Sequence, residues 1–460
     1  MSNERKLPGA GENKMGVMPV GKLLFNMALP MILSMLVQAF YNVVDSIYVS
    51  RISESAVTAL SLAFPVQNLQ IGFATGIGVG VNSLLSKSLG EGDTERVNRS
   101  AGNGIFLTAL ITVAFMLFGV FGARPYFAMQ SEVAETVNGG TAYVAICCIG
   151  TLGIFVEILG EKLLQSSGRT VYTLYTQGTG AIINILLDPV FIFGWFGAPK
   201  MGIAGAAVAT VIGQWVAAIM AVFFNFKYNP DVKFGLKYLK PKADAIRPIL
   251  TVGVPSVIMM AIGSIMNFGI NQILQGFKSY GETATSVFGI YFKLQSFFFM
   301  PVFGLNNATI SIVAYNYGAR NPQRITATLK RAVLSVLSIM VLGTAVFQLI
   351  PDVLLSIFNP SDDFLAIGIS ALRIISINFP IAAICIALSA SFQALGNGIY
   401  STITSLCRQL LVLLPVAYLL SLSGDVHIVW WAYPIAEVVS LTVTLIFFVR
   451  IYRKKIKPMF

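Results

Sequence analysis

Two acidic side chains lie inside long apolar runs, where a carboxyl group has a chemical use. Asp45 follows Pro30 by fifteen residues, and Asp188 lies four residues after Asn184 and directly before Pro189. Because residues four apart lie on one face of a helix, Asn184 and Asp188 would point the same way. A carboxylate beside an amide oxygen suits a hard cation, and a protonated carboxyl can hydrogen-bond to an amide. These acids are therefore candidates for binding a cation or a proton.

Each acid also has a purely structural interpretation. Asp45 could pair with Arg51 near the outer end of its helix. Asp188 could be the N-cap of a helix that starts at Pro189, around a break in the run. Glu161 lies late in its run and could reach the membrane surface by snorkelling. These alternatives stay open at the level of the sequence.

The composition is that of a membrane protein. Of the 460 residues, 56% are hydrophobic and only 11% are charged, and the mean hydropathy is +0.76. Soluble domains carry roughly 25% charged residues, so this chain has too little polar surface to face water on all sides. Its net charge of +11 raises the question of nucleic acid. The basic residues lie in short loops between apolar runs, however, which indicates membrane topology and no nucleic-acid partner.

The apolar runs are long enough to cross a bilayer as helices, which takes about 20 residues each. We count twelve, at 23–49, 56–84, 101–123, 138–163, 172–196, 202–226, 249–276, 284–314, 327–350, 364–392, 398–422 and 428–449. The sequence therefore predicts an all-α polytopic membrane protein with twelve transmembrane helices.

The loops on one side of these helices hold 24 of the 31 Lys and Arg residues. The loops on the other side hold only Arg51, Arg124, Lys200 and Lys278. Because basic loops stay in the cytoplasm, we expect both termini on the cytoplasmic side of the cell membrane.

The chain also repeats itself. A shift of 228 residues aligns 54–96 with 282–324 and pairs Gly76 with Gly304 and Gly90 with Gly318, while a shift of 225 pairs Pro30 with Pro255. The repeat predicts two pseudo-symmetric lobes of six helices, 1–226 and 249–460, joined by a cytoplasmic linker at 227–248. Because six is an even number, both lobes enter the membrane from the same face, and rocking of one against the other would give alternating access.

Several short motifs occur in a familiar order. They are Leu29-Pro30, Val44-Asp45-Ser46, Gly90-x-Gly-Asp93, Asn184-x-x-x-Asp188-Pro189, Gly205-Ala206-Ala207 and Ala432-x-Pro434-x-Ala436-Glu437. Together they resemble the multidrug and toxic compound extrusion (MATE) family, of bacterial and archaeal type, over essentially the whole chain. The resemblance implies the fold of that family and its superfamily. It also implies a secondary antiporter that exports amphipathic, often cationic compounds in exchange for H⁺ or Na⁺.

The resemblance also implies roles for individual residues. Ion coupling, to H⁺ or Na⁺, falls on Asp45, Asn184, Asp188 and Thr210, and Pro30 is implied as a place where the first helix bends. Glu161 matches a cavity acid of some relatives. Aromatic and methionine side chains accept many amphipathic shapes, so Tyr291, Phe292 and Met300 are further candidates for the substrate cavity.

Other classes of protein fit less well. The chain has a single histidine, His427, and neither H-E-x-x-H nor G-x-S-x-G, which argues against an enzyme; it also lacks a G-x-x-x-x-G-K-[ST] loop for ATP. A channel is a further possibility, although duplicated lobes favour a transporter. The nearest alternative is a flippase for lipid-linked precursors in the related superfamily. We expect no cofactor beyond the coupling ion, small amphipathic or cationic molecules and the lipid bilayer as partners, and a monomer.

Overall fold

The computed structural model describes residues 13–278, 280–358 and 361–460, which are almost entirely helical and include no strand. The first half comprises α1 (Lys14–Val17), α2 (Val20–Ser50), α3 (Glu54–Glu91), α4 (Thr94–Leu117), η1 (Phe118–Gly122), α5 (Ala123–Ala128), α6 (Ala134–Ile149), α7 (Leu152–Ser166), α8 (Val171–Phe193), η2 (Trp195–Gly197) and α9 (Ile203–Tyr228). The second half, after η3 (Leu236–Leu239), comprises α10 (Ala243–Gln275), α11 (Gly281–Gly318), α12 (Pro322–Leu349), α13 (Pro351–Ser356), α14 (Asp362–Ser376), α15 (Phe379–Ala394), α16 (Gly398–Leu406), η4 (Cys407–Leu413), α17 (Leu414–Ser421), α18 (Val426–Val429), α19 (Ala432–Ile451), η5 (Tyr452–Ile456) and η6 (Lys457–Met459).

The prediction of twelve spans is confirmed. Within the described residues, ten helical segments are long and apolar enough to cross a membrane, and two bent pairs, α6 with α7 and α14 with α15, complete the twelve. The pairs bend by 45° and 46°. The second bend has a clear local cause: Pro380 has no N–H to donate and its ring would clash with the carbonyl four residues earlier, so α14 ends at Ser376 and Pro380 lies in the first turn of α15.

The sequence repeat recurs in the helix caps. Asp93 accepts a hydrogen bond from the backbone N–H of Arg96 and caps α4, and Asn321 accepts one from that of Arg324 and caps α12. The two caps are 228 residues apart, as are the two arginines. Each cap satisfies one of the unpaired N–H groups of its helix, so the same device starts the third spanning helix of each half.

The halves meet at two helix crossings where glycines allow backbones to touch. A Cβ atom on Gly76 of α3 would lie 2.7 Å from the carbonyl oxygen of Gly253 in α10. A Cβ atom on the repeat-equivalent Gly304 of α11 would lie 2.8 Å from the backbone nitrogen of Ile32 in α2. The repeat therefore places equivalent glycines at equivalent crossings.

A second pair of equivalent glycines lies where the C-terminal ends of α3 and α11 meet. A Cβ atom on Gly90 would lie 1.9 Å from the carbonyl oxygen of Tyr315, and one on Gly318 would lie 2.0 Å from that of Lys87. Neither position can hold a larger residue unless the two backbones separate. This contact joins the halves at the end that carries most of the basic loops.

The short helix α1 joins the halves at the same end. The side chain of Asn13 donates to the carbonyl of Ser167 in the first half, at 3.0 Å. The carbonyl of Met15 accepts from Asn316 at 3.2 Å and from Arg324 at 2.9 Å, both in the second half. The segment before α2 thus bridges the two halves.

Each half contributes the start of one helix to a hydrophobic core of the other half. Leu23, Met27 and Met31, from the first part of α2, belong to the large core of the second half. Conversely, Ala245 and Ile249, from the first part of α10, belong to a core made by α3, α4 and α7 of the first half. Each half is therefore completed by the start of a helix from the other.

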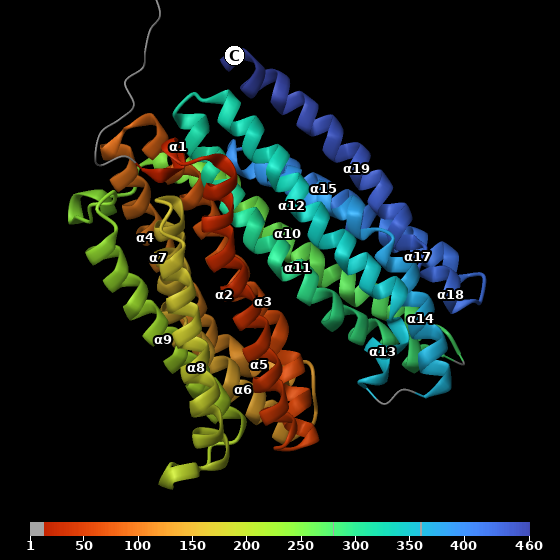
Figure 1. Cartoon of the computed structure of the whole chain (residues 1–460). Coiled ribbons are helices and arrows are strands. Elements are labelled where there is room, and N and C mark those ends of the chain that lie inside the picture. Colours follow the sequence, from red (N-terminus) through yellow and green to blue (C-terminus); the bar gives the residue numbers. More distant parts are fainter. Residues whose placement is uncertain (1–12, 279, 359–360) are drawn as a thin grey trace, which may run out of the picture.

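Away from this end the halves diverge. In Figure 1, α5, α6 and the end of α8 lie at the lower left, while α13, α14 and α18 lie at the lower right. Hydrogen bonds between described residues of the two halves connect α1, α3 and α7 with α11, α12 and α15. The molecule is therefore joined at one end and splayed at the other.

We expect Gly90→Ala to lower the free energy of unfolding by about 1–3 kcal/mol, because the new methyl group overlaps a backbone oxygen that cannot rotate away. Thermal unfolding of the purified protein in detergent measures this. Gly178→Ala in α8 is the matched control, since a Cβ there meets no heavy atom within 4 Å. Equal melting temperatures for the two variants would contradict the proposed role of the crossing.

Candidate functional site

Three helices of the first half bring the predicted ion-coupling residues together. Asp45 lies in the last part of α2, Asn184 and Asp188 lie in α8, and Thr210 lies in α9. The helix α8 packs against both α2 and α9. Asp188 is completely buried and Asn184 is 3% exposed.

The polar atoms of this site are only partly paired. The Asn184 side-chain amide donates to Thr210 Oγ1 at 3.2 Å and faces Asp188 Oδ1 at 3.5 Å. Asn184 Oδ1, Asp188 Oδ2 and Asp45 Oδ1 are buried, and none of them has a hydrogen-bond partner among the described residues. The carboxyl groups of Asp45 and Asp188 are also close enough to interact electrostatically.

Such unpaired oxygens define what the site can bind. A buried acceptor without a donor costs free energy, and two neighbouring carboxylates repel each other. A proton on one carboxyl or a hard cation between the oxygens removes both costs. Because the described residues hold no cluster of three His, Cys, Asp or Glu side chains, a cation here would need amide or hydroxyl oxygens as well. The donor set therefore fits H⁺ or Na⁺.

Two structural alternatives for these acids are wrong. The helix α8 runs unbroken from Val171 to Phe193 with Pro189 inside it, so Asp188 is not an N-cap. Among the described side chains, no ion pair joins Asp45 to Arg51. Neither acid is therefore accounted for by a local structural role.

Glu161 lies deeper in the protein than the snorkelling interpretation allows. It is 3% exposed and accepts hydrogen bonds from Thr176 at 2.6 Å and from Gln177 at 2.9 Å, both in α8. The adjacent Lys162 is also buried, and its ammonium group donates to Asn307 of the second half at 3.0 Å. Lys162 therefore forms a contact between the halves.

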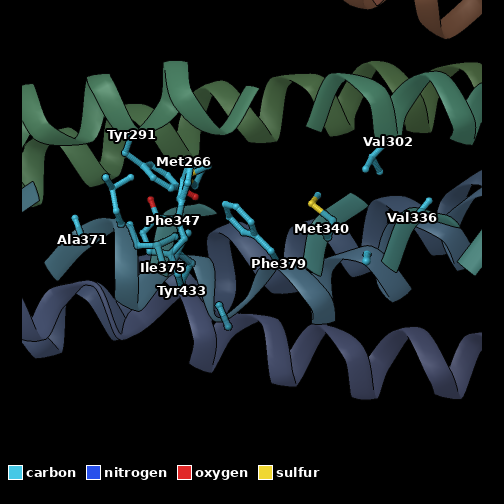
Figure 2. Close-up of a cluster of buried hydrophobic side chains, with 14 of the residues drawn as sticks. Met266, Tyr291, Val302, Val336, Met340, Phe347, Ala371, Ile375, Phe379 and Tyr433 are labelled. Carbon is cyan, nitrogen blue, oxygen red and sulfur yellow. The ribbon is translucent and has the colours of Figure 1, made fainter. Parts of the chain in front are cut away.

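The candidates in α11 have different environments. Tyr291 is 2% exposed, donates to Gln295 at 2.7 Å, and lies among buried aromatic side chains such as Phe347 (Figure 2). Phe292 is 36% exposed and Met300 is partly exposed. The structure does not bring these three together with Asp45.

Sequence reasoning missed some neighbours of the site. Tyr41 is a neighbour of Asp45, Asp188 and Glu157. Its spacing of four residues before Asp45 on one helix was a usable signal, because both then lie on one helix face. The partners of Glu161 in α8 gave no such signal, since they depend on how α7 packs against α8.

Comparison with known sequences decides the family. The sequence model described as MatE matches residues 30–190 and 255–419, one segment in each half. The chain belongs to the MatE family. It is therefore a multi-pass membrane transporter and not an enzyme.

Relatives of this MatE protein match over nearly their full length. The multidrug export protein MepA of Staphylococcus haemolyticus is 22% identical over 89% of both chains. The probable multidrug resistance protein YoeA of Bacillus subtilis is 26% identical over 93% of both. An FAD transporter of Shewanella oneidensis is 24% identical over 91% of this chain and 92% of its own.

Solved structures confirm the fold. A MATE protein in complex with MaL6 is 25% identical, with a TM-score of 0.90 over 98% of this chain and 99% of that one. The outward-facing conformation of a multidrug resistance MATE family transporter of the MOP superfamily also gives a TM-score of 0.90, at 24% identity over 98% of this chain and 99% of that one.

A buried ion pair in the second half offers a clear contrast to the unpaired site. Glu437 is 4% exposed and lies 3.4 Å from Arg408. We expect Arg408→Met to lower the free energy of unfolding by about 3 kcal/mol, because it leaves the carboxylate buried without a cation. The double variant Arg408→Met/Glu437→Leu should regain most of that loss in a thermal unfolding assay. A double variant no more stable than the single one would show that the pair is not the cause.

Proposed function

We propose that this protein is a secondary active multidrug efflux antiporter, which exports amphipathic or cationic compounds in exchange for H⁺ or Na⁺. Relatives of similar length are described as multidrug export and multidrug resistance proteins. The most direct structural support is the set of unpaired buried oxygens on Asp45, Asn184 and Asp188. A transporter needs such a site to alternate between an occupied and an empty state, whereas a structural site is satisfied permanently.

The helix α2 is the element that would couple the ion site to the two lobes, 1–226 and 249–460. Its last part carries Asp45, while its first part, including Met27 and Met31, lies in the core of the second half. Pro30 lies directly before Met31, where the part packed in the second half ends, and it lacks a backbone N–H, so bending there breaks no hydrogen bond of its own. Binding at Asp45 would thus change how α2 joins the lobes, with 227–248 as the linker.

The charge distribution supports an orientation. If the basic end faces the cytoplasm, as the loop charges favour, then the end at which the halves are joined is cytoplasmic and the splayed end faces outward. Alternating access would open the joined end by breaking the contacts of α1, Gly90 and Gly318. Moving one elementary charge across 100 mV releases about 2.3 kcal/mol, which is a sufficient energy source for a chain without an ATP loop.

The transported compound would contact residues outside the ion site. Glu161, Tyr291, Phe292 and Met300 are proposed to contact it, and a buried acid favours a cationic compound. One relative is described as an FAD transporter, so an anionic dinucleotide is a useful comparison cargo in any assay.

We expect Asp45→Asn and Asp188→Asn each to reduce ethidium efflux from reconstituted vesicles by at least about tenfold, because coupling to the ion is lost. Asp352→Asn is the matched control, since Asp352 is exposed in α13 and far from the site. Retained melting temperatures would show that the variants fold. Normal efflux by both site variants would refute the assigned site.

The coupling ion follows from imposing proton and sodium gradients separately on the same vesicles. We expect one gradient to drive efflux of the wild type and neither to drive it in Asp45→Asn. Folded wild-type protein that moves ethidium under neither gradient would refute drug antiport and favour a lipid-linked substrate.

A further inference from the structure

The basic end of the second half is unusual because none of its described Lys and Arg side chains forms an ion pair with an acidic side chain of the described residues. After Glu282 the acidic residues of the chain are Asp352, Asp362, Asp363, Asp425 and Glu437. The first four lie in or beside α13, α14 and α18, at the opposite end of the molecule from the end of α19 (Figure 1). Glu437 pairs with Arg408.

The first half behaves differently at the same end. Arg96 pairs with Glu91 at 3.1 Å, Arg99 pairs with Asp244 of the inter-lobe segment, and Arg169 pairs with Asp231 of that segment. Part of the positive charge there is therefore neutralised within the protein. The positive-inside rule alone does not explain this difference, because it requires basic residues in both halves but no absence of acids in one.

These cations without an ion pair concentrate at the end of α19 and directly after it. Basic residues in this stretch are Arg450, Arg453, Lys454, Lys455 and Lys457. Lys455 is used internally, because its ammonium group donates to the carbonyl of Leu395 at 2.6 Å. Arg453 and Lys457 are exposed. They have no ion-pair partner among the described residues.

Arg453 and Lys457 line a groove with aromatic walls. The groove has a volume of about 500 Å³, and Phe448, Tyr452 and Phe460 also line it. The rings of Phe448 and Tyr452 are 6.2 Å apart. The final turn, Lys457–Met459, brings the last residue of the chain back to the groove. Two cations and an apolar wall therefore share one recess.

The surroundings of the groove identify its occupant. It lies at the end of a candidate span, Val426–Met459, and Val449, which also lines it, is 45% exposed. Ile446, one turn earlier, is 60% exposed. An apolar ridge that faces lipid thus leads directly to two cations at the membrane boundary. A phospholipid with a negatively charged headgroup matches both parts, since its acyl chain suits the ridge and its phosphate suits Arg453 and Lys457.

We propose that the groove formed by Phe448, Tyr452, Arg453, Lys457 and Phe460 is a specific binding site for one anionic phospholipid of the leaflet that this end faces. The lipid phosphate lies between Arg453 and Lys457, and one acyl chain follows Phe448 and Val449 along α19. The lipid would supply negative charge to the basic end of the second half, whose described cations form no ion pairs. This proposal does not depend on ion coupling or on the cargo.

Native mass spectrometry of the full-length protein, titrated with phosphatidylglycerol or phosphatidylcholine in detergent, tests it. We expect the first phosphatidylglycerol to bind about tenfold more tightly than phosphatidylcholine, and Arg453→Gln/Lys457→Gln to abolish that preference. The matched control is Arg450→Gln/Lys454→Gln, which removes the same charge from exposed neighbours that do not line the groove. The control should keep the preference.

Each other outcome overturns the proposal. If the groove variant and the control lost the same amount of the phosphatidylglycerol preference, the lipid would be attracted by diffuse positive charge and not by the groove. No lipid preference in the wild type would mean no site. Displacement of the lipid by millimolar inorganic phosphate would mean an anion site without lipid recognition. Phe448→Ser tests the contact with the acyl chain separately. An unchanged phosphatidylglycerol affinity in this variant would mean that the aromatic wall does not contribute to binding, against the proposal. A melting temperature equal to that of the wild type confirms that each variant is folded.

Discussion

Backbone contact between helices at glycine is the constraint on which the arrangement of the two halves depends. Lipid gives no hydrophobic drive for two helices to associate, so close van der Waals packing has to replace it. Gly76 and Gly304 provide the two central crossings, and Gly90 and Gly318 provide the contact at the basic end. Because repeat-equivalent glycines make equivalent backbone contacts, the interface between the halves is pseudo-symmetric.

The crossings also explain why α2 connects distant parts of the protein. Because α2 must reach Gly304 of α11, its first part is packed in the core of the second half. Its last part then returns to the first half and brings Asp45 beside α8. The repeat-equivalent helix, α10, makes the same exchange in the opposite direction through Ile249. A change at the proposed ion site would therefore act on an element shared by both halves.

Hydrogen-bond satisfaction separates the ion site from the other buried acids. Glu161 is paired with Thr176 and Gln177, and Glu437 is paired with Arg408. The oxygens of Asp45 and Asp188 stand out because the surrounding helices supply too few donors. In a membrane interior water does not compensate for this, which is why we propose that an ion or a proton does so. At the surface, the cations near the C-terminus that lack an ion-pair partner among the described residues likewise favour the binding of an anionic lipid, as proposed above.

The sequence by itself determined the twelve spans, the duplication and the family, because hydropathy, repeated glycines and the order of motifs are local signals. It also placed Asn184 and Asp188 on one helix face, since helical spacing fixes that. Only the tertiary structure decided that α8 continues through Pro189, that Lys162 bonds to Asn307 across the halves, and that Tyr291 lies within a core. These facts depend on which helices meet and at what height, and single-helix periodicity carries no information about either.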